Sequence, residues 1–179
     1  MNIPNYLSFS RVLAVPVFIV LMLDPTPPRA ILAGCVFAVA SATDWLDGHL
    51  ARKWGQVTRI GKLLDPIADK ILVSAALIVL VEIDSSRVPA WMAITLIGRE
   101  IAVTGLRAMA ASDGVVIPAE TVGKFKVSAQ IIAVLAFIIN YAVQAEWAAD
   151  LGKAAIWLAM VLSLSSGLQY FRNYWKRIG

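Results

Sequence analysis

Six apolar stretches, each close to the length of a membrane-spanning helix, fill most of this 179-residue chain. A spanning α-helix needs about 20 mainly apolar residues, and 59% of the residues here are hydrophobic. The stretches are Leu7–Leu23, Ala30–Ala51, Gly61–Val81, Val88–Ala111, Val122–Val143 and Leu151–Phe171. Because the connections are short, no separate soluble domain remains. We therefore expect a single domain over residues 1–179, an all-α membrane protein built as a bundle of six transmembrane helices.

The basic residues predict how this bundle lies in the membrane. Only Arg29, Arg87 and Lys153 fall on one expected side, whereas eleven basic residues fall on the other. The eleven are Arg11, Arg52, Lys53, Arg59, Lys62, Arg107, Lys124, Lys126, Arg172, Lys176 and Arg177. Since Lys and Arg concentrate in cytoplasmic loops, both termini are expected in the cytoplasm and the protein in the inner (cytoplasmic) membrane.

Charge and cysteine content narrow the possible partners. The net charge of +4 could indicate nucleic acid, but basic residues along one membrane face are explained more simply by anionic lipid headgroups. The N-terminus lacks a basic segment before an apolar core, so we expect no signal peptide. Cys35 is the only cysteine, which excludes an internal disulfide.

Four carboxylates interrupt this apolar chain within 26 residues: Asp44, Asp47, Asp65 and Asp69. An ionised Asp at the centre of a spanning helix costs about 2.5–3.5 kcal/mol. On a helix the first pair (i, i+3) lies about 60° apart and the second (i, i+4) about 40° apart. Two opposed helices would therefore form a cage of oxygen ligands, which suits Mg²⁺ or Mn²⁺ better than zinc.

Two alternatives compete with this metal site. Asp65 precedes Pro66, a pair typical of a helix start, so helix capping could account for one carboxylate. It does not account for Asp69, one turn deeper in an apolar segment. A cation transporter would also need buried carboxylates, but not the neighbouring Gly48, Ala51 and Arg52. On the same helix, Gly48 would leave room for a metal-bound phosphate and Arg52 would clamp it.

The spacing D-x2-D-G-x2-A-R-x8-G-x3-D-x3-D, from Asp44 to Asp69, resembles the signature of the CDP-alcohol phosphatidyltransferases without a mismatch. The resemblance extends to the segments 2–7, 64–70, 98–101 and 123–130, and so covers nearly the whole chain. It implies a transfer of the phosphatidyl group from CDP-diacylglycerol to an alcohol, with release of CMP. The flanking segments imply sn-glycerol 3-phosphate as the acceptor. Inositol phosphate, serine or phosphatidylglycerol remain open as alternatives.

The same resemblance assigns roles to individual residues. Asp44, Asp47, Asp65 and Asp69 would bind two divalent cations, Mg²⁺ or Mn²⁺, and Asp69 would also accept the proton of the attacking hydroxyl. Gly48, Ala51, Arg52 and Thr58 would bind CDP-diacylglycerol, although Thr58 could equally be an ordinary loop hydroxyl. Membrane lipids and a second copy of the chain, in a homodimer, are the implied partners, and no nucleic acid is expected.

Four basic residues of the fourth and fifth helices are candidates for the acceptor's phosphate. They are Arg99, Arg107, Lys124 and Lys126. A phosphate monoester arriving from the cytoplasm needs charge-assisted hydrogen bonds of this kind. For Arg99 a second interpretation stays open, in which it pairs with a carboxylate inside the bundle.

Overall fold

The computed structural model describes the backbone of residues 3–54, 59–112 and 122–178 and the side chains of residues 9–43, 67–68, 70–112 and 125–175. Within these residues all regular structure is helical. The helices are α1 (Ile3–Met22), α2 (Pro27–Trp54), α3 (Arg59–Ile83), α4 (Ala90–Ser112), α5 (Val122–Val143) and α6 (Glu146–Ile178). The prediction of an all-α chain with six helices is confirmed.

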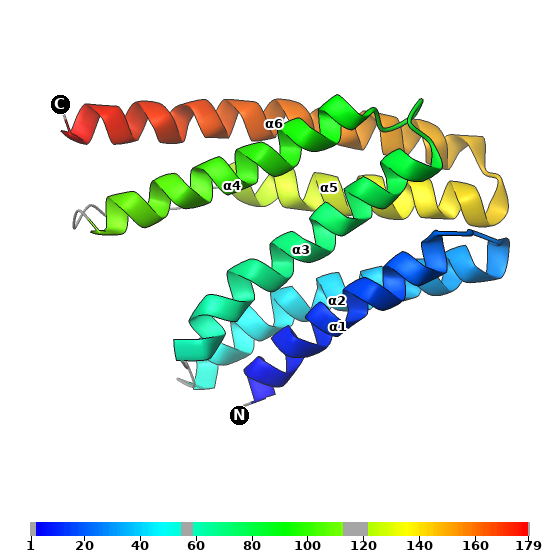
Figure 1. Cartoon of the computed structure of the whole chain (residues 1–179), viewed down its shortest axis with the longest axis horizontal. Coiled ribbons are helices and arrows are strands. Elements are labelled where there is room, and N and C mark those ends of the chain that lie inside the picture. The colour runs from blue at the N-terminus through cyan, green and yellow to red at the C-terminus, as the bar shows by residue number, and fades with distance from the viewer. Residues whose placement is uncertain (1–2, 55–58, 113–121, 179) are drawn as a thin grey trace.

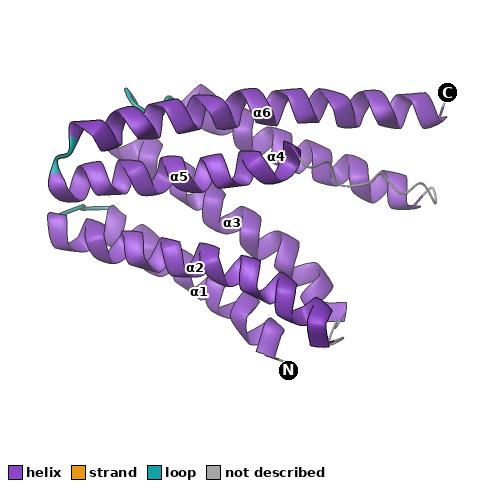
Figure 2. Cartoon of the chain, turned by 180° about the vertical axis from the view of Figure 1, so that it is seen from behind, coloured by secondary structure: helices purple, strands orange, loops and turns teal. Residues whose placement is uncertain are grey.

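The helices run alternately up and down in two groups (Figure 1). α1 packs against α2 and α3, while α6 packs against α4 and α5. α3 crosses between the groups, as Figure 2 also shows from behind, and α2 contacts α5. As a result, the N-terminus, the C-terminus, the helix ends next to residues 55–58 and those next to residues 113–121 all lie at one end of the molecule. Eight of the eleven basic residues of the predicted cytoplasmic side lie at these helix ends: Arg52, Lys53, Arg59, Lys62, Lys124, Lys126, Lys176 and Arg177.

Local signals set several helix boundaries. Pro27 and Pro28 open α2, where a missing N–H costs nothing, and the carbonyl of Thr26 accepts the first helical bond from Ala30 N at 2.8 Å. At the same end of the molecule, α5 ends before Gln144, whose φ of 54° reverses the chain toward α6. The alternative in which Asp65 and Pro66 start a helix is wrong: α3 begins at Arg59, so both residues lie inside it.

The core joins all six helices. Phe18 of α1 and Phe37 of α2 are fully buried, with ring centroids 5.6 Å apart, and they lie in one cluster with apolar side chains of α3, α4, α5 and α6. The outer faces are also apolar: Ile94 is 69% exposed and Leu168 is 72% exposed. Two described segments, Phe125–Val143 and Glu146–Trp175, are long and apolar enough to cross a membrane.

A polar cluster fastens two connections at the end of the molecule opposite the termini. Arg87, in the α3–α4 connection, pairs with Asp84 at 2.9 Å, donates a hydrogen bond to Asn140 of α5 and lies 5.9 Å from the ring centroid of Tyr141. Asn140 in turn donates to the carbonyl of Ala145 at 2.8 Å, just before α6. The cluster therefore fixes α3 and α4 relative to α5 and α6.

Replacing Arg87 by Ala is expected to lower the free energy of unfolding in detergent by about 1–2 kcal/mol, because a half-buried charged hydrogen bond is lost. Arg29→Ala is the matched control, since its pair with Asp24 is largely exposed and contributes close to nothing. Equal thermal midpoints of the Arg87→Ala and Arg29→Ala variants would contradict the prediction.

The hydrogen bond from the Ser86 hydroxyl holds the pKa of Asp84 below its usual 3.8. A lowered carboxyl pKa stabilises the fold above pH 4, and this contribution is lost as the pH falls below the usual value.

Candidate active site

The four signature aspartates all lie on helical backbone near the end of the molecule that carries the termini. Asp44 and Asp47 are in the last part of α2, and Asp65 and Asp69 are in the first half of α3. The two helices contact one another. The helical spacing on which the predicted cage depends is therefore present in both pairs, while the four side chains lie outside those described.

Packing between α1 and α2 supports the helix that carries Asp44. Arg11 of α1 is 1% exposed, and its Nε donates to the carbonyl of Ala40 at 3.2 Å. Ala40 lies one turn before Asp44, and the same carbonyl also accepts a bond from the Thr43 hydroxyl at 2.8 Å. A buried guanidinium on a main-chain carbonyl holds α1 and α2 together beside the signature.

The predicted donor-binding residues fall on or beside the same segment. Gly48, Ala51 and Arg52 are on α2, on helical backbone after Asp47. Their side-chain positions and the whole of Thr58 lie outside the described residues. These assignments stay predictions.

Two of the four predicted acceptor cations meet at one carboxylate. Arg99 and Lys126 both contact Oε1 of Glu100, the former through Nη1 at 2.9 Å. Their side chains are only 9% and 7% exposed. Arg107 is exposed two turns further along α4, and the side chain of Lys124 is outside the described set. The structure thus brings Arg99 together with Lys126 and leaves Arg107 apart from them.

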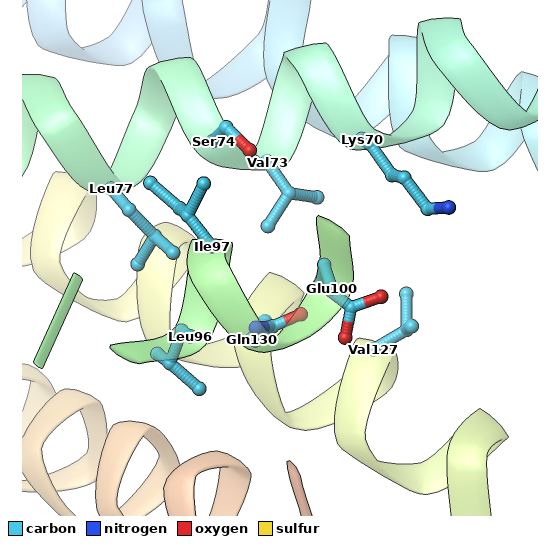
Figure 3. Close-up of a pocket in the computed structure, with 9 residues that line it drawn as sticks. All are labelled: Lys70, Val73, Ser74, Leu77, Leu96, Ile97, Glu100, Val127 and Gln130. Carbon is cyan, nitrogen blue, oxygen red and sulfur yellow. The ribbon is translucent and has the colours of Figure 1, made fainter. Parts of the chain in front are cut away.

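A small cavity of about 20 Å³ lies between α3, α4 and α5 beside this carboxylate (Figure 3). Its polar lining comes from Lys70 and Ser74 of α3, Glu100 of α4 and Gln130 of α5. The amino group of Lys70 donates to the hydroxyl of Thr104, which itself donates to the carbonyl of Glu100 at 2.7 Å. Lys70, which lines the cavity, follows the predicted base Asp69 directly in the sequence of α3.

Glu100, Lys70 and Gln130 were not among the predicted site residues. One signal for the first two was available in the sequence, because Glu100 and Lys70 are charged residues inside apolar stretches, the same feature that drew attention to the aspartates. The four charged groups Lys70, Arg99, Lys126 and Glu100 leave a net excess of two positive charges beside the cavity. Such a site favours an anion.

Comparison with known sequences decides the family. The sequence profile of the CDP-alcohol phosphatidyltransferases matches residues 1–165. The chain belongs to this family. As a family member it carries the full signature from Asp44 to Asp69, so the reaction class expected from the sequence has independent support.

Individual relatives cover almost the entire phosphatidyltransferase chain. A Bacillus subtilis (strain 168) protein is 43% identical over 189 residues, covering 99% of this chain and 97% of its own. A Pseudomonas fluorescens protein is 40% identical over 181 residues, covering 99% and 92%. An Escherichia coli (strain K12) protein is 38% identical over 171 residues, covering 94% and 92%. All three are named CDP-diacylglycerol–glycerol-3-phosphate 3-phosphatidyltransferase.

Proposed function

We propose that this protein transfers the phosphatidyl group of CDP-diacylglycerol to sn-glycerol 3-phosphate, forming phosphatidylglycerol phosphate and CMP in anionic phospholipid synthesis. The observation that carries the proposal is the near-full-length similarity, at 38–43% identity, to the three relatives with this name. The cationic surroundings of the α3–α4–α5 cavity support a phosphorylated acceptor over serine, which has no net charge.

The reaction exchanges one phosphorus–oxygen bond for another. A hydroxyl oxygen of glycerol 3-phosphate attacks the phosphorus that carries diacylglycerol, and the bond to the bridging oxygen breaks, so that this oxygen leaves with CMP. Asp69 accepts the proton of the hydroxyl, and Gly48, Ala51, Arg52 and Thr58 hold the CDP group. Asp44, Asp47, Asp65 and Asp69 offer only carboxylate oxygens, a donor set that fits two Mg²⁺ or Mn²⁺ ions. When bound, these ions offset the negative charge of the pyrophosphate.

The proposed location is the inner membrane, with all six helices spanning it and the active site facing the cytoplasm. Large apolar side chains on the outer faces of the helices, among them Ile94 and Leu168, favour contact with lipid. The end of α2 and the start of α3, which carry the aspartates, belong to the same end of the molecule as both termini, as do the basic residues at the starts of α3 and α5 and at the end of α6. The positive-inside rule therefore assigns that end to the cytoplasm, where water-soluble glycerol 3-phosphate is available. A homodimer is proposed from family resemblance.

An assay of the purified protein tests the reaction and its acceptor together. The protein in detergent–lipid micelles is supplied with CDP-diacylglycerol and, in separate reactions, glycerol 3-phosphate, inositol phosphate, serine or phosphatidylglycerol. Release of CMP is expected with glycerol 3-phosphate and not with the other alcohols. CMP release with only a different alcohol would show that this alcohol is the acceptor. No CMP release with any of the four would contradict the proposed reaction.

Replacing Arg107 or Lys124 by Ala is expected to raise the KM for glycerol 3-phosphate about ten-fold or more. A hydrogen bond from a cation to phosphate contributes about 1.5–3 kcal/mol, and 1.4 kcal/mol corresponds to a factor of ten. The KM for CDP-diacylglycerol should stay the same, because Arg52 and the aspartate site hold that substrate.

The matched control is Lys153→Ala, which removes an exposed cation from α6 near the opposite end of the molecule. It should change neither KM. An equal loss of affinity for both substrates in the Arg107 and Lys124 variants, or no loss for either, would show that these residues are not acceptor ligands.

A further inference from the structure

The side chain of Arg99 on α4 is held by a contact with α6 as well as by one within α4. Its Nη2 donates to Oγ of Ser166 at 2.6 Å, and its Nη1 pairs with Glu100 at 2.9 Å. Ser166 is fully buried, and its hydroxyl also donates to the carbonyl of Leu162 at 2.6 Å. Since that bond uses the hydroxyl hydrogen, a lone pair of Oγ is left facing the guanidinium. The direction of the Arg99 side chain is therefore set by a residue 67 positions away.

The next residue of α6 makes room for this arrangement. A Cβ built on Gly167 would lie 3.1 Å from Nε and 3.3 Å from Cγ of Arg99. Both separations are tighter than ordinary van der Waals contact, so any side chain here would push Arg99 away from α6. Nε is itself buried, without a hydrogen-bond partner among the described residues. The side chain of Arg99 thus lies directly against the α6 backbone, and a Cβ at position 167 would require it to shift by a few tenths of an ångström.

Glu100 carries the effect to α5. Its Oε1 accepts hydrogen bonds from both Arg99 and Lys126. Lys126 is buried, and Glu100 lines the α3–α4–α5 cavity together with Lys70. A displacement of Arg99 would therefore move the carboxylate that orients Lys126. Ser166, Arg99, Glu100 and Lys126 form one continuous polar contact from α6 through α4 to α5.

We propose that Ser166 and Gly167 of α6 are positioning residues for the acceptor: they seat Arg99, and through Glu100 they orient Lys126 toward the phosphate of glycerol 3-phosphate. This inference rests on the proposed function. It adds two residues, outside the signature and the predicted basic cluster, that determine the affinity for the acceptor without touching it. The donor site on α2 and α3 does not depend on them.

The test measures both Michaelis constants and kcat for Ser166→Ala and Gly167→Ala. Each variant is expected to raise the KM for glycerol 3-phosphate about three- to ten-fold, because one charge-assisted contact is lost or displaced. kcat at saturating acceptor and the KM for CDP-diacylglycerol should stay within about two-fold of the unaltered enzyme. If the two residues served folding alone, their replacement would not raise the KM for glycerol 3-phosphate while leaving the KM for CDP-diacylglycerol unchanged.

Three matched variants serve as controls. Ser165→Ala removes an exposed hydroxyl that bonds the same Leu162 carbonyl, and Gly105→Ala adds a methyl group where nothing lies within 4 Å. Both should leave the KM for glycerol 3-phosphate unchanged. Gly152→Ala places a Cβ 2.8 Å from the Phe137 ring. It should therefore lower the thermal midpoint without changing the KM for one substrate more than the KM for the other.

Two results would overturn the inference. If Arg107→Ala and Lys124→Ala raise the acceptor KM while Ser166→Ala and Gly167→Ala do not, the proposed function stands and the α6 residues have no positioning role. If the Ser166 and Gly167 variants behave like Gly152→Ala, with a lower thermal midpoint and equal effects on both substrates, their role is in folding. Failure of the proposed function itself gives a different result, the absence of CMP release with glycerol 3-phosphate in the unaltered enzyme.

Discussion

Asp69→Asn is expected to reduce phosphatidyl transfer by about 10²–10⁴-fold, the usual cost of losing a general base. Asn keeps the size of the side chain but cannot take up a proton at neutral pH. Binding of CDP-diacylglycerol should be largely retained, because Arg52 and the other three aspartates still hold the donor. The measurements are CMP release at saturating substrates and equilibrium binding of CDP-diacylglycerol to the variant.

Two further variants make this result specific. Asp150→Asn makes the same chemical change at an exposed position of α6 and should leave the rate unchanged. Asp44→Asn, at a residue proposed to act as a metal ligand only, should weaken donor binding as well as the rate. If Asp69→Asn turns over at a rate close to that of the unaltered enzyme, Asp69 is not the general base.

The helical architecture could be predicted because apolar content and length leave few alternatives. Where the sequence analysis placed helix limits, the structure differs most at polar ends. α6 runs from Glu146 to Ile178, well beyond the apolar stretch Leu151–Phe171, because helical hydrogen bonding continues through the basic C-terminal residues. α3 likewise includes polar residues before its apolar stretch and starts at Arg59, so Asp65 and Pro66 do not begin the helix. Apolar patterning locates the buried part of a helix, and capping groups locate its ends.

The acceptor cluster shows what the sequence could not give. Arg99 and Lys126 were candidates from their charge, but their common partner Glu100 is separated from Lys126 by 26 positions, and only the packing of α6 against both α4 and α5 brings the groups together. The structure supports the alternative that Arg99 pairs with a carboxylate in the bundle. Its contact with Ser166 had no local signal, since a Ser followed by a Gly in an apolar helix is an ordinary pair of small residues.

Removing divalent cations is expected to abolish transfer, and adding Mg²⁺ or Mn²⁺ should restore it. Asp44, Asp47, Asp65 and Asp69 supply only oxygen ligands on two helices that contact one another, and hard cations are the ions such ligands prefer. Four carboxylates in this setting also repel one another, so the ions should stabilise the fold. At a hundred times the dissociation constant a bound ion adds about 2.7 kcal/mol to the free energy of unfolding.

The thermal midpoint therefore gives a second measurement that does not depend on activity. It should rise with Mg²⁺ or Mn²⁺ in the unaltered protein and in Asp150→Asn, and rise much less in Asp44→Asn. Full activity after treatment with a chelator would show that the aspartates serve another purpose than cation binding. A thermal midpoint that responds equally in all three proteins would place the bound ion elsewhere, because only the α2–α3 site loses a ligand in the Asp44 variant.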